Sequence, residues 1–161
     1  MKALLLLCAL AAADAPTPEV RAHGVRVLGP EGWARSLEDT TVVFTSPQKD
    51  ASLRIDTFEK PAQTEPQACL DQIIDKLSNG DKAEKKTYAP GFVDGQPAAT
   101  QVKFTDGRKQ RERRAAGCNG RSYFLVDWVE ASHAGPKYEP QFQRLLSTVH
   151  FEPLAAPKAD R

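Results

Sequence analysis

Residues 98–130, AATQVKFTDGRKQRERRAAGCNGRSYFLVDWVE, are the stretch that decides the fold. Two dipeptides that favour tight hairpin turns, at 106–107 (DG) and 119–120 (NG), divide it into three segments. Because side chains alternate along a strand, Val102 and Phe104 are predicted to point inward from the first segment. The third segment has one apolar face, made by Phe124, Val126 and Trp128. The sequence therefore predicts a three-stranded antiparallel meander.

One amphipathic helix is predicted before this meander in the sequence, and a second is predicted after it. The first begins near Pro66, is capped by Thr64 or Glu65, and ends at 79–80 (NG). Its apolar side chains recur at helical spacing: Leu70, Ile73, Ile74 and Leu77. The second covers about 139–148, and its apolar stripe consists of Phe142, Leu145, Leu146 and Val149. Residues 149–152 are then predicted to form a short edge strand.

Three further segments, at 25–27, 40–45 and 51–59, precede the first helix. They alternate apolar with polar side chains or are rich in β-branched residues, which is typical of strands. Two helices with one apolar face each need a sheet to cover. The predicted fold class is therefore α+β, with a single antiparallel sheet flanked by helices.

The first fifteen residues, MKALLLLCALAAADA, have the features of a secretory signal peptide. Lys2 precedes an apolar run that is shorter than the roughly 20 residues needed to span a bilayer, and an A-x-A pattern follows. Cleavage after Ala13 and cleavage after Ala15 both fit this pattern, and a lipid-modified Cys8 is a third interpretation. We expect an exported protein, periplasmic or secreted, without a transmembrane segment in its mature chain. The expected parts are a signal peptide (1–15), a loose tail (16–24), one domain (25–152) and a disordered tail (153–161).

Two cysteines, Cys69 and Cys118, remain once the signal peptide is removed. Two cysteines in an exported protein most often form a disulfide. Cys69 lies on the flank of the first predicted helix and Cys118 beside the second hairpin turn, so a bridge would connect helix and sheet. It would close a loop of about 50 residues and contribute roughly 4 kcal/mol in the loop-entropy model. Two unpaired thiols and a reactive thiol are the alternatives.

Four local patterns resemble the PsbP-like/Mog-like family of α/β/α sandwiches. They are residues 27–33 (VLGPEGW), 93–98 (VDGQPA), 120–125 (GRSYFL) and 138–151 (YEPQFQRLLSTVHF). In that family such patterns mark the opening strand, the turn into the second set of strands, a later strand, and the closing helix and strand. The resemblance covers residues 25–152, and it implies that this domain has the fold of the family.

The resemblance implies less about activity than about fold. Members of this family serve as extrinsic subunits of the photosynthetic oxygen-evolving complex, as Ran-binding import factors and as exported bacterial proteins. They share no catalytic motif, and fold-level analogy is a poor guide to activity. This chain looks like an exported bacterial member, so neither photosystem binding nor Ran binding carries over to it.

A basic run, RKQRERR, holds five positive charges and one negative charge. On a strand, Lys109, Arg111 and Arg113 lie on one face, and Arg108 and Arg114 lie on the other. One interpretation is that exposed charges keep a hairpin soluble and discourage edge pairing. The other is that these five side chains form a docking site for an anionic partner such as an acidic protein, a lipid headgroup or a polysaccharide.

No spacing in the sequence is typical of a metal site, a cofactor site or a catalytic site. The histidines, His23, His133 and His150, are far apart, and no short metal-ligand spacing occurs. The net charge of +1 argues against a general nucleic-acid binder. We therefore expect no metal, no cofactor and no nucleic-acid partner.

The leading hypothesis is an exported, non-enzymatic accessory or binding protein that binds a protein or another anionic partner outside the cytoplasm. A polyanion- or acidic-partner-binding module that uses the basic run is one alternative. A small hydrolase with an unrecognised site is the other. A charged pocket that holds His133 or His150 beside an acid would favour the hydrolase, whereas a continuous basic stripe would favour the polyanion binder.

Overall fold

The computed structural model describes residues 18–153. Its largest element is an antiparallel sheet of seven strands. In chain order these are β3 (Ala34–Glu38), β4 (Thr41–Thr45), β5 (Ala51–Glu59), β6 (Ala89–Val93), β7 (Gln96–Thr105), β8 (Gln110–Cys118) and β9 (Ser122–Ala131). Their order across the sheet is β3-β4-β5-β9-β8-β7-β6. The predicted meander is thus present as β7, β8 and β9, which pair as neighbours.

A second, smaller sheet joins the two ends of the described chain. It consists of β1 (Glu19–Ala22), β2 (Val25–Leu28) and β10 (His150–Phe151), in the order β1-β2-β10. The sequence predicted a single sheet that includes 25–27, and a loose tail over 16–24. Instead, Val20 is buried opposite Val27 in the small sheet, because a tight turn at residues 23–24 folds β1 back onto β2. The predicted signal peptide and the predicted tail at 154–161 lie outside the described residues.

Three helices complete the fold: α1 (Pro66–Leu77), α2 (Lys82–Lys85) and α3 (Gly135–Thr148), with short 3-10 turns at Asp106–Arg108 and Ser132–Ala134. The carboxylate of Glu65 caps α1 by accepting a hydrogen bond from the backbone N–H of Ala68 at 2.7 Å. α3 begins before the predicted residue 139, because Pro136 occupies its first turn and Pro140 is accommodated inside the helix. Within residues 18–153, every helix is too short or too polar to cross a bilayer.

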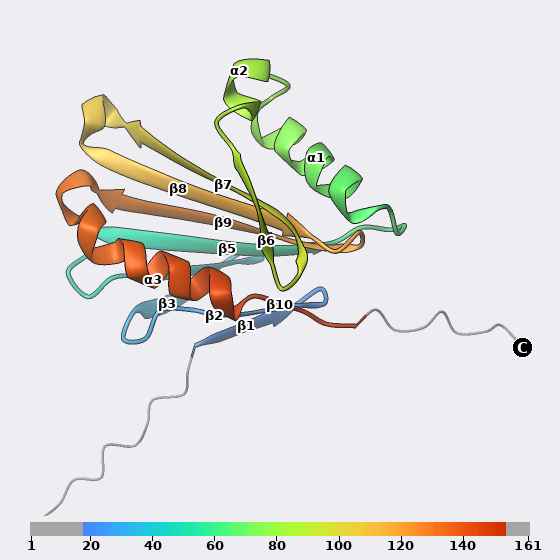
Figure 1. The fold of residues 1–161 in the computed structure, drawn as a ribbon. Helices are drawn as coiled ribbons and strands as arrows, with labels where there is room; N and C mark the ends of the chain where they lie inside the picture. The colour runs from blue at the N-terminus through green and yellow to red at the C-terminus, as the bar shows by residue number, and fades with distance from the viewer. Residues whose placement is uncertain (1–17, 154–161) are drawn as a thin grey trace, which may run out of the picture.

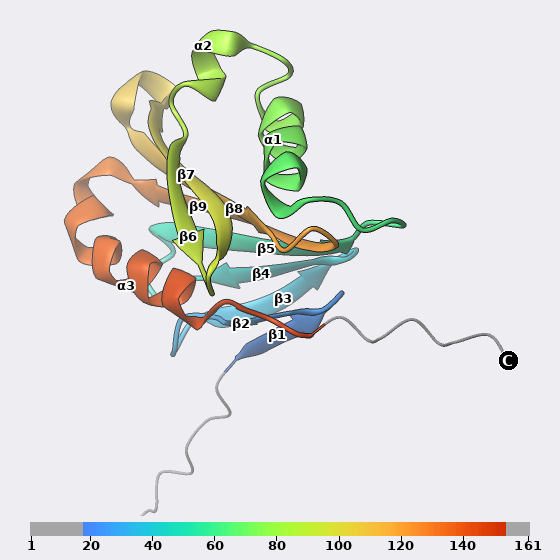
Figure 2. The ribbon, with the colours of Figure 1, turned by 45° about the vertical axis from the view of Figure 1, so that its right-hand side comes forward.

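The elements form three layers, with the large sheet in the middle. Figure 1 shows α1 and α3 on opposite faces of this sheet. Figure 2 shows the small sheet on the side that also carries α3. This arrangement confirms the α+β class with a large antiparallel sheet, to which the structure adds the second sheet.

The two faces of the large sheet have cores of different sizes. The face toward α3 buries large rings, among them Trp33, Phe124, Trp128, Tyr138 and Phe142, together with the valines of the small sheet. The ring centres of Trp33 and Trp128 are 5.0 Å apart. The face toward α1 buries a smaller cluster that includes Leu70, Ile73, Ala99, Ala116 and the two cysteines. The small sheet and α3 therefore share one core, and α1 has a separate one.

Candidate functional site

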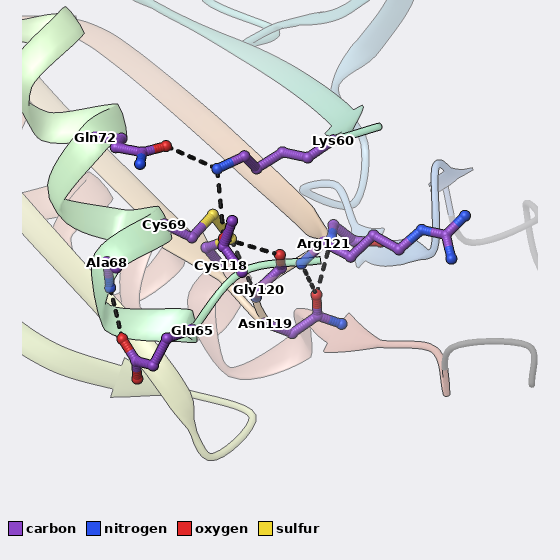
Figure 3. Close-up of a disulfide and its surroundings, with 11 residues drawn as sticks. Lys60, Glu65, Ala68, Cys69, Gln72, Cys118, Asn119, Gly120 and Arg121 are labelled. Atoms are coloured by element: carbon purple, nitrogen blue, oxygen red, sulfur yellow. Dashed lines mark hydrogen bonds between the residues drawn. A yellow bond between two sulfur atoms is a disulfide. The ribbon is translucent and has the colours of Figure 1, made fainter. Parts of the chain in front are cut away.

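A disulfide joins Cys69 in α1 to Cys118 at the end of β8, as the cysteine count predicted. The two Cα atoms are 6.1 Å apart, and both cysteines are fully buried. Figure 3 shows this bond between the helix and the β8–β9 turn. The disulfide therefore fixes α1 to the sheet at one point.

The β8–β9 turn is shaped by Asn119 and Gly120 (Figure 3). The side-chain oxygen of Asn119 accepts hydrogen bonds from the backbone N–H groups of Arg121 and Ser122, at 3.1 and 2.8 Å. Gly120 has a φ of +95°, and a Cβ atom at this position would lie 2.2 Å from the carbonyl oxygen of Thr64. Glycine is therefore required where the segment before α1 crosses the turn.

Arg113, one of the five predicted anion-binding residues, is buried. It donates hydrogen bonds to Glu130 from Nε at 3.1 Å and from Nη2 at 3.0 Å, and its Nη1 donates to the carboxylate of Glu139 in α3. Arg113 and Glu130 are both 1% exposed. A buried guanidinium needs such partners, because desolvating an unpaired charge is costly. Arg113 therefore connects α3 to the sheet and does not contribute to a cationic surface.

The carboxylate of Glu139, in α3, accepts hydrogen bonds from two side chains. Its Oε1 accepts a hydrogen bond from Gln143 at 3.0 Å, and its Oε2 accepts from Arg113. The hydrogen bond from Gln143 and the hydrogen bond and charge of Arg113 hold the pKa of Glu139 below its ordinary value. Glu139 is therefore a carboxylate at neutral pH, at the solvent end of the buried ion pair.

The other four predicted residues occupy different surroundings. Arg114 lies on the α1 side of the sheet and pairs with Asp127, with 2.7 Å between Nε and Oδ1. Arg111 is half-buried, with its guanidinium carbon 5.6 Å from the ring centre of Phe104. Arg108 and Lys109 are exposed at the β7–β8 turn. The five side chains do not form a continuous basic stripe, which corrects the expectation that they are exposed together.

Val102 and Phe104 in β7 are exposed, although the sequence predicted that they point into the core. They lie on the α3 side of the sheet, since Val102 is opposite Arg113 and Phe104 is opposite Arg111. Their exposed fractions are 46% and 53%. The sequence thus predicted the correct face of β7 for these two side chains, but the prediction that they are buried is wrong. They are exposed because α3 packs over Trp128 and leaves this half of β7 uncovered.

A groove continues this exposed stretch along β7. It is a cavity of about 390 Å³ between α3 and the β6–β7 hairpin. Its lining includes Gly91, Val93, Ala98, Thr100, Gln143 and Leu146. Thr100 is followed on the same face of β7 by Val102, because alternate residues of a strand share a face. We call Val102, Phe104, Arg108, Lys109 and Arg111 the β7 surface.

One predicted histidine does lie beside an acid. Nδ1 of His150 is 2.9 Å from Oδ2 of Asp94, which is in the β6–β7 turn and lines the groove. The same oxygen of Asp94 accepts a hydrogen bond from the backbone N–H of Phe151 at 2.8 Å. The nearby hydroxyl of Ser147 donates to the carbonyl of Arg144. The pair therefore ties β10 to the hairpin, and no hydrogen bond to His150 from a hydroxyl is present within residues 18–153.

The other two histidines stand apart from this pair. Nδ1 of His23 is 3.2 Å from the hydroxyl of Thr57, and His133 is exposed. Within the described part of the chain, His, Cys, Asp and Glu side chains do not gather in a group of three that could hold a metal ion.

Sequence reasoning missed the pairing of Arg113 with Glu130 and of Asp94 with His150. A signal for the first was available, because Arg113 shares its strand face with Ala115 and Gly117, and small side chains in alternation indicate a covered face. No local signal marks the second pair, since Asp94 and His150 are brought together only by the return of β10 to the start of the domain.

The sequence matches no protein-family model and no curated protein. Its fold is similar to that of PsbP (CyanoP) from Synechocystis sp. PCC 6803, with a TM-score of 0.56 and 16% identity over 80% of this chain and 87% of that chain. It is also similar to LpqN of Mycobacterium tuberculosis, a protein involved in cell envelope biogenesis, with a TM-score of 0.58 and 9% identity over 87% of both chains. The PsbP-like fold that the four sequence patterns indicate is thus confirmed.

A third similar structure is a protein of Bacteroides thetaiotaomicron, with a TM-score of 0.60 and 11% identity. The match covers 81% of this chain and 46% of that one, so this chain spans less than half of the length of that protein. Identities this low establish a shared fold and leave activity to be argued from the surface of this chain.

Proposed function

We propose that this protein is an exported accessory protein that binds an acidic, partly apolar segment of a partner protein at the β7 surface. The observation that carries the proposal is the exposure of Val102 and Phe104 on an otherwise core-facing side of the sheet. Exposed apolar side chains that continue a groove are typical of binding surfaces. The similar structures, which include a protein involved in cell envelope biogenesis and a PsbP protein, are compatible with an accessory role.

Charge selects the kind of partner. Arg108 and Lys109 follow Phe104 at the β7–β8 turn, and the guanidinium of Arg111 lies against the ring of Phe104. An aromatic side chain with cations at one end suits a segment that combines apolar side chains with carboxylates. Because Arg113 and Arg114 are already paired, the attraction is expected to come from the remaining three cations.

Export is supported by three independent features. The first fifteen residues have the pattern of a signal peptide. The buried Cys69–Cys118 disulfide is typical of an oxidising compartment. LpqN, a structural neighbour, is involved in cell envelope biogenesis. A periplasmic or secreted location accounts for all three.

A selection of random displayed peptides on the immobilised, disulfide-bonded protein tests the binding proposal. We expect the enriched peptides to combine Asp or Glu with Phe, Leu or Trp. Replacing Phe104 by Ser should weaken their binding at least about fivefold, because truncating an anchoring aromatic costs more than about 1 kcal/mol. Replacing both Arg108 and Lys109 by Ser should reduce the salt dependence of binding.

Leu37→Ser is the matched control, because Leu37 is 69% exposed but lies in β3, at the edge of the sheet opposite the β6–β7 hairpin. Equal losses in Leu37→Ser and Phe104→Ser would contradict the proposed surface. Enrichment of purely acidic sequences that bind the Phe104→Ser variant normally would instead favour the polyanion-binding alternative.

A small hydrolase is the second candidate, and the His150–Asp94 pair is the observation that favours it. A carboxylate on Nδ1 orients a histidine for base catalysis, as in hydrolase triads. A panel of ester and amide substrates tests this candidate directly. Turnover that disappears in His150→Ala but persists in His133→Ala would establish an enzyme. Absence of turnover in the unmodified protein would remove the candidate.

A further inference from the structure

The β3 edge of the large sheet is open. Within residues 18–153, β3 pairs with β4 and with no other strand, and all five of its residues are exposed. Leu37, at 69%, is among the most exposed large apolar side chains. An unpaired edge presents N–H and C=O groups that can pair with another strand.

The register shows which backbone groups of β3 are free. Glu38 is opposite Thr41 across the two-residue turn at 39–40, so these two residues exchange hydrogen bonds, as the residues flanking such a turn do. Hydrogen-bonded positions alternate along an antiparallel pair. Ser36 therefore also bonds to β4, whereas the backbone groups of Arg35 and Leu37 point away from the sheet.

Leu37 is the last member of an apolar row that crosses the sheet. In register it lies opposite Val42, which lies opposite Ile55, which in turn lies opposite Val126. Those three side chains are buried on the α3 side, and only Leu37 is left in solvent. A strand added to this edge would extend the row and cover Leu37.

The opposite edge of the sheet is protected in a way that the β3 edge is not. By the same register argument, Phe92 and Pro90 are the outward-facing positions of β6. Proline has no N–H to donate, so it blocks strand addition at this edge. Residues 34–38 (ARSLE) contain no proline and no glycine.

We propose that the β3 edge binds the β3 edge of a second copy of this chain in antiparallel orientation. A two-fold axis normal to the sheet at Leu37 places Leu37 opposite Leu37 of the second copy. It also brings Arg35 of each copy toward Asp39 of the other copy, which lies in the turn directly after β3. Opposite charges at the two ends of the strand pair attract each other. The register centred on Ser36 would instead place Arg35 opposite Leu37, so the Leu37-centred register has the better complementarity.

Cross-linking tests the register. Side chains directly opposite in an antiparallel pair have Cβ atoms about 4.5–5.5 Å apart, within reach of a disulfide after small adjustments. We expect Leu37→Cys, in the protein with its native disulfide, to form a covalent dimer under mild oxidation. Phe92→Cys, an exposed position at the protected edge, should remain monomeric under the same conditions. Equal cross-linking of the two variants would overturn the proposal.

Sedimentation velocity over a concentration series tests the dimer itself. We expect the unmodified protein to shift from monomer to dimer with rising concentration, and Leu37→Pro, which removes an outward N–H, to remain monomeric. Leu37→Lys and Arg35→Glu provide variants that keep all hydrogen bonds to β4, and each should raise the dissociation constant at least about tenfold. A protein that stays monomeric up to about 1 mM, or a dimer unaffected by these variants, would refute the β3 interface.

Discussion

The two helices that cover the large sheet are held in different ways. α3 packs on a face of large rings, and Trp128 contacts Phe142 with their ring centres 5.9 Å apart. α1 packs on a face of small side chains, Ala99 and Ala116, through Leu70 and Ile73. Because stabilisation scales with the apolar area removed from water, the alanine face contributes less per residue. The disulfide connects α1 to the face with the smaller core. α3 is thus held to the sheet by packing of large rings, whereas α1 is held by a covalent bond in addition to its packing.

The strongest test of this difference is Trp128→Ala. Trp128 is fully buried, and its removal leaves a cavity next to Trp33, Tyr138 and Phe142. We expect the free energy of unfolding in urea to fall by about 3–5 kcal/mol. Val129→Ala, on the same strand but on the opposite face of the sheet and only half-buried, should cost less than about 1.5 kcal/mol. Similar losses for both variants would show that the two faces contribute equally.

Two adjacent arginines allow the same comparison for charge. Arg113 is buried under α3 with Glu130, and Arg114 is partly exposed on the α1 side with Asp127. Arg113→Ala leaves a buried carboxylate unpaired and should cost about 3–5 kcal/mol in unfolding free energy. Arg114→Ala removes a partly solvated pair and should cost about 1 kcal/mol or less. Glu130→Gln should then recover part of the loss in Arg113→Ala, and the absence of recovery would contradict the unpaired-charge explanation.

Removing the disulfide tests whether α1 depends on it. The double variant Cys69→Ala, Cys118→Ala should lower the unfolding free energy by about 2–4 kcal/mol, since the bridge connects residues 49 apart. Amide hydrogen exchange locates the effect: we expect protection to be lost first in α1, while α3 keeps its protection until global unfolding. Simultaneous loss in both helices would mean that the two cores are not separable.

The smallest expected effect is a pH dependence on the α3 side. Hydrogen bonds from Tyr138 and Ser46 hold the pKa of Asp50 below its ordinary value. A carboxylate whose pKa is lowered by folding stabilises the protein above its unfolded pKa, and this contribution is lost as the pH falls through the folded pKa. The stability difference between the unmodified protein and Asp50→Asn should therefore be present at pH 7 and decline below about pH 4. A difference that does not change with pH would exclude titration of Asp50 as its cause.

Local patterns predicted the elements that depend on neighbours in the sequence. The alternation of Leu53 and Ile55 with Arg54 and Asp56 matches the burial of β5, and the stripe that starts at Leu70 matches α1. Turn dipeptides at 106–107 and 119–120 correctly separated the strands of the meander. These features were predictable because each is determined within a few residues.

What could not be predicted depends on contacts between distant segments. The small sheet pairs residues near both ends of the domain, and no periodicity in 19–22 indicates a partner at 150–151. The burial of Arg113 and the exposure of Phe104 follow from where α3 lies across the sheet. Alternation assigns a side chain to a face of a strand, but it does not determine whether another element covers that face.

The position of β10 makes the last described residues a condition for completing the core. Phe151 lies opposite Val25, and the backbone N–H of Glu152 donates to the carbonyl of Gly24. The strands from β3 to β9 are continuous in the chain between 34 and 131, so they can associate while the C-terminal part is still being synthesised. Until β10 has been synthesised, the valines of β1 and β2 lack the strand that completes the small sheet. A chain cut short near residue 149 would thus expose apolar surface at its own beginning, which is the kind of surface that chaperones and proteases recognise in an incomplete product.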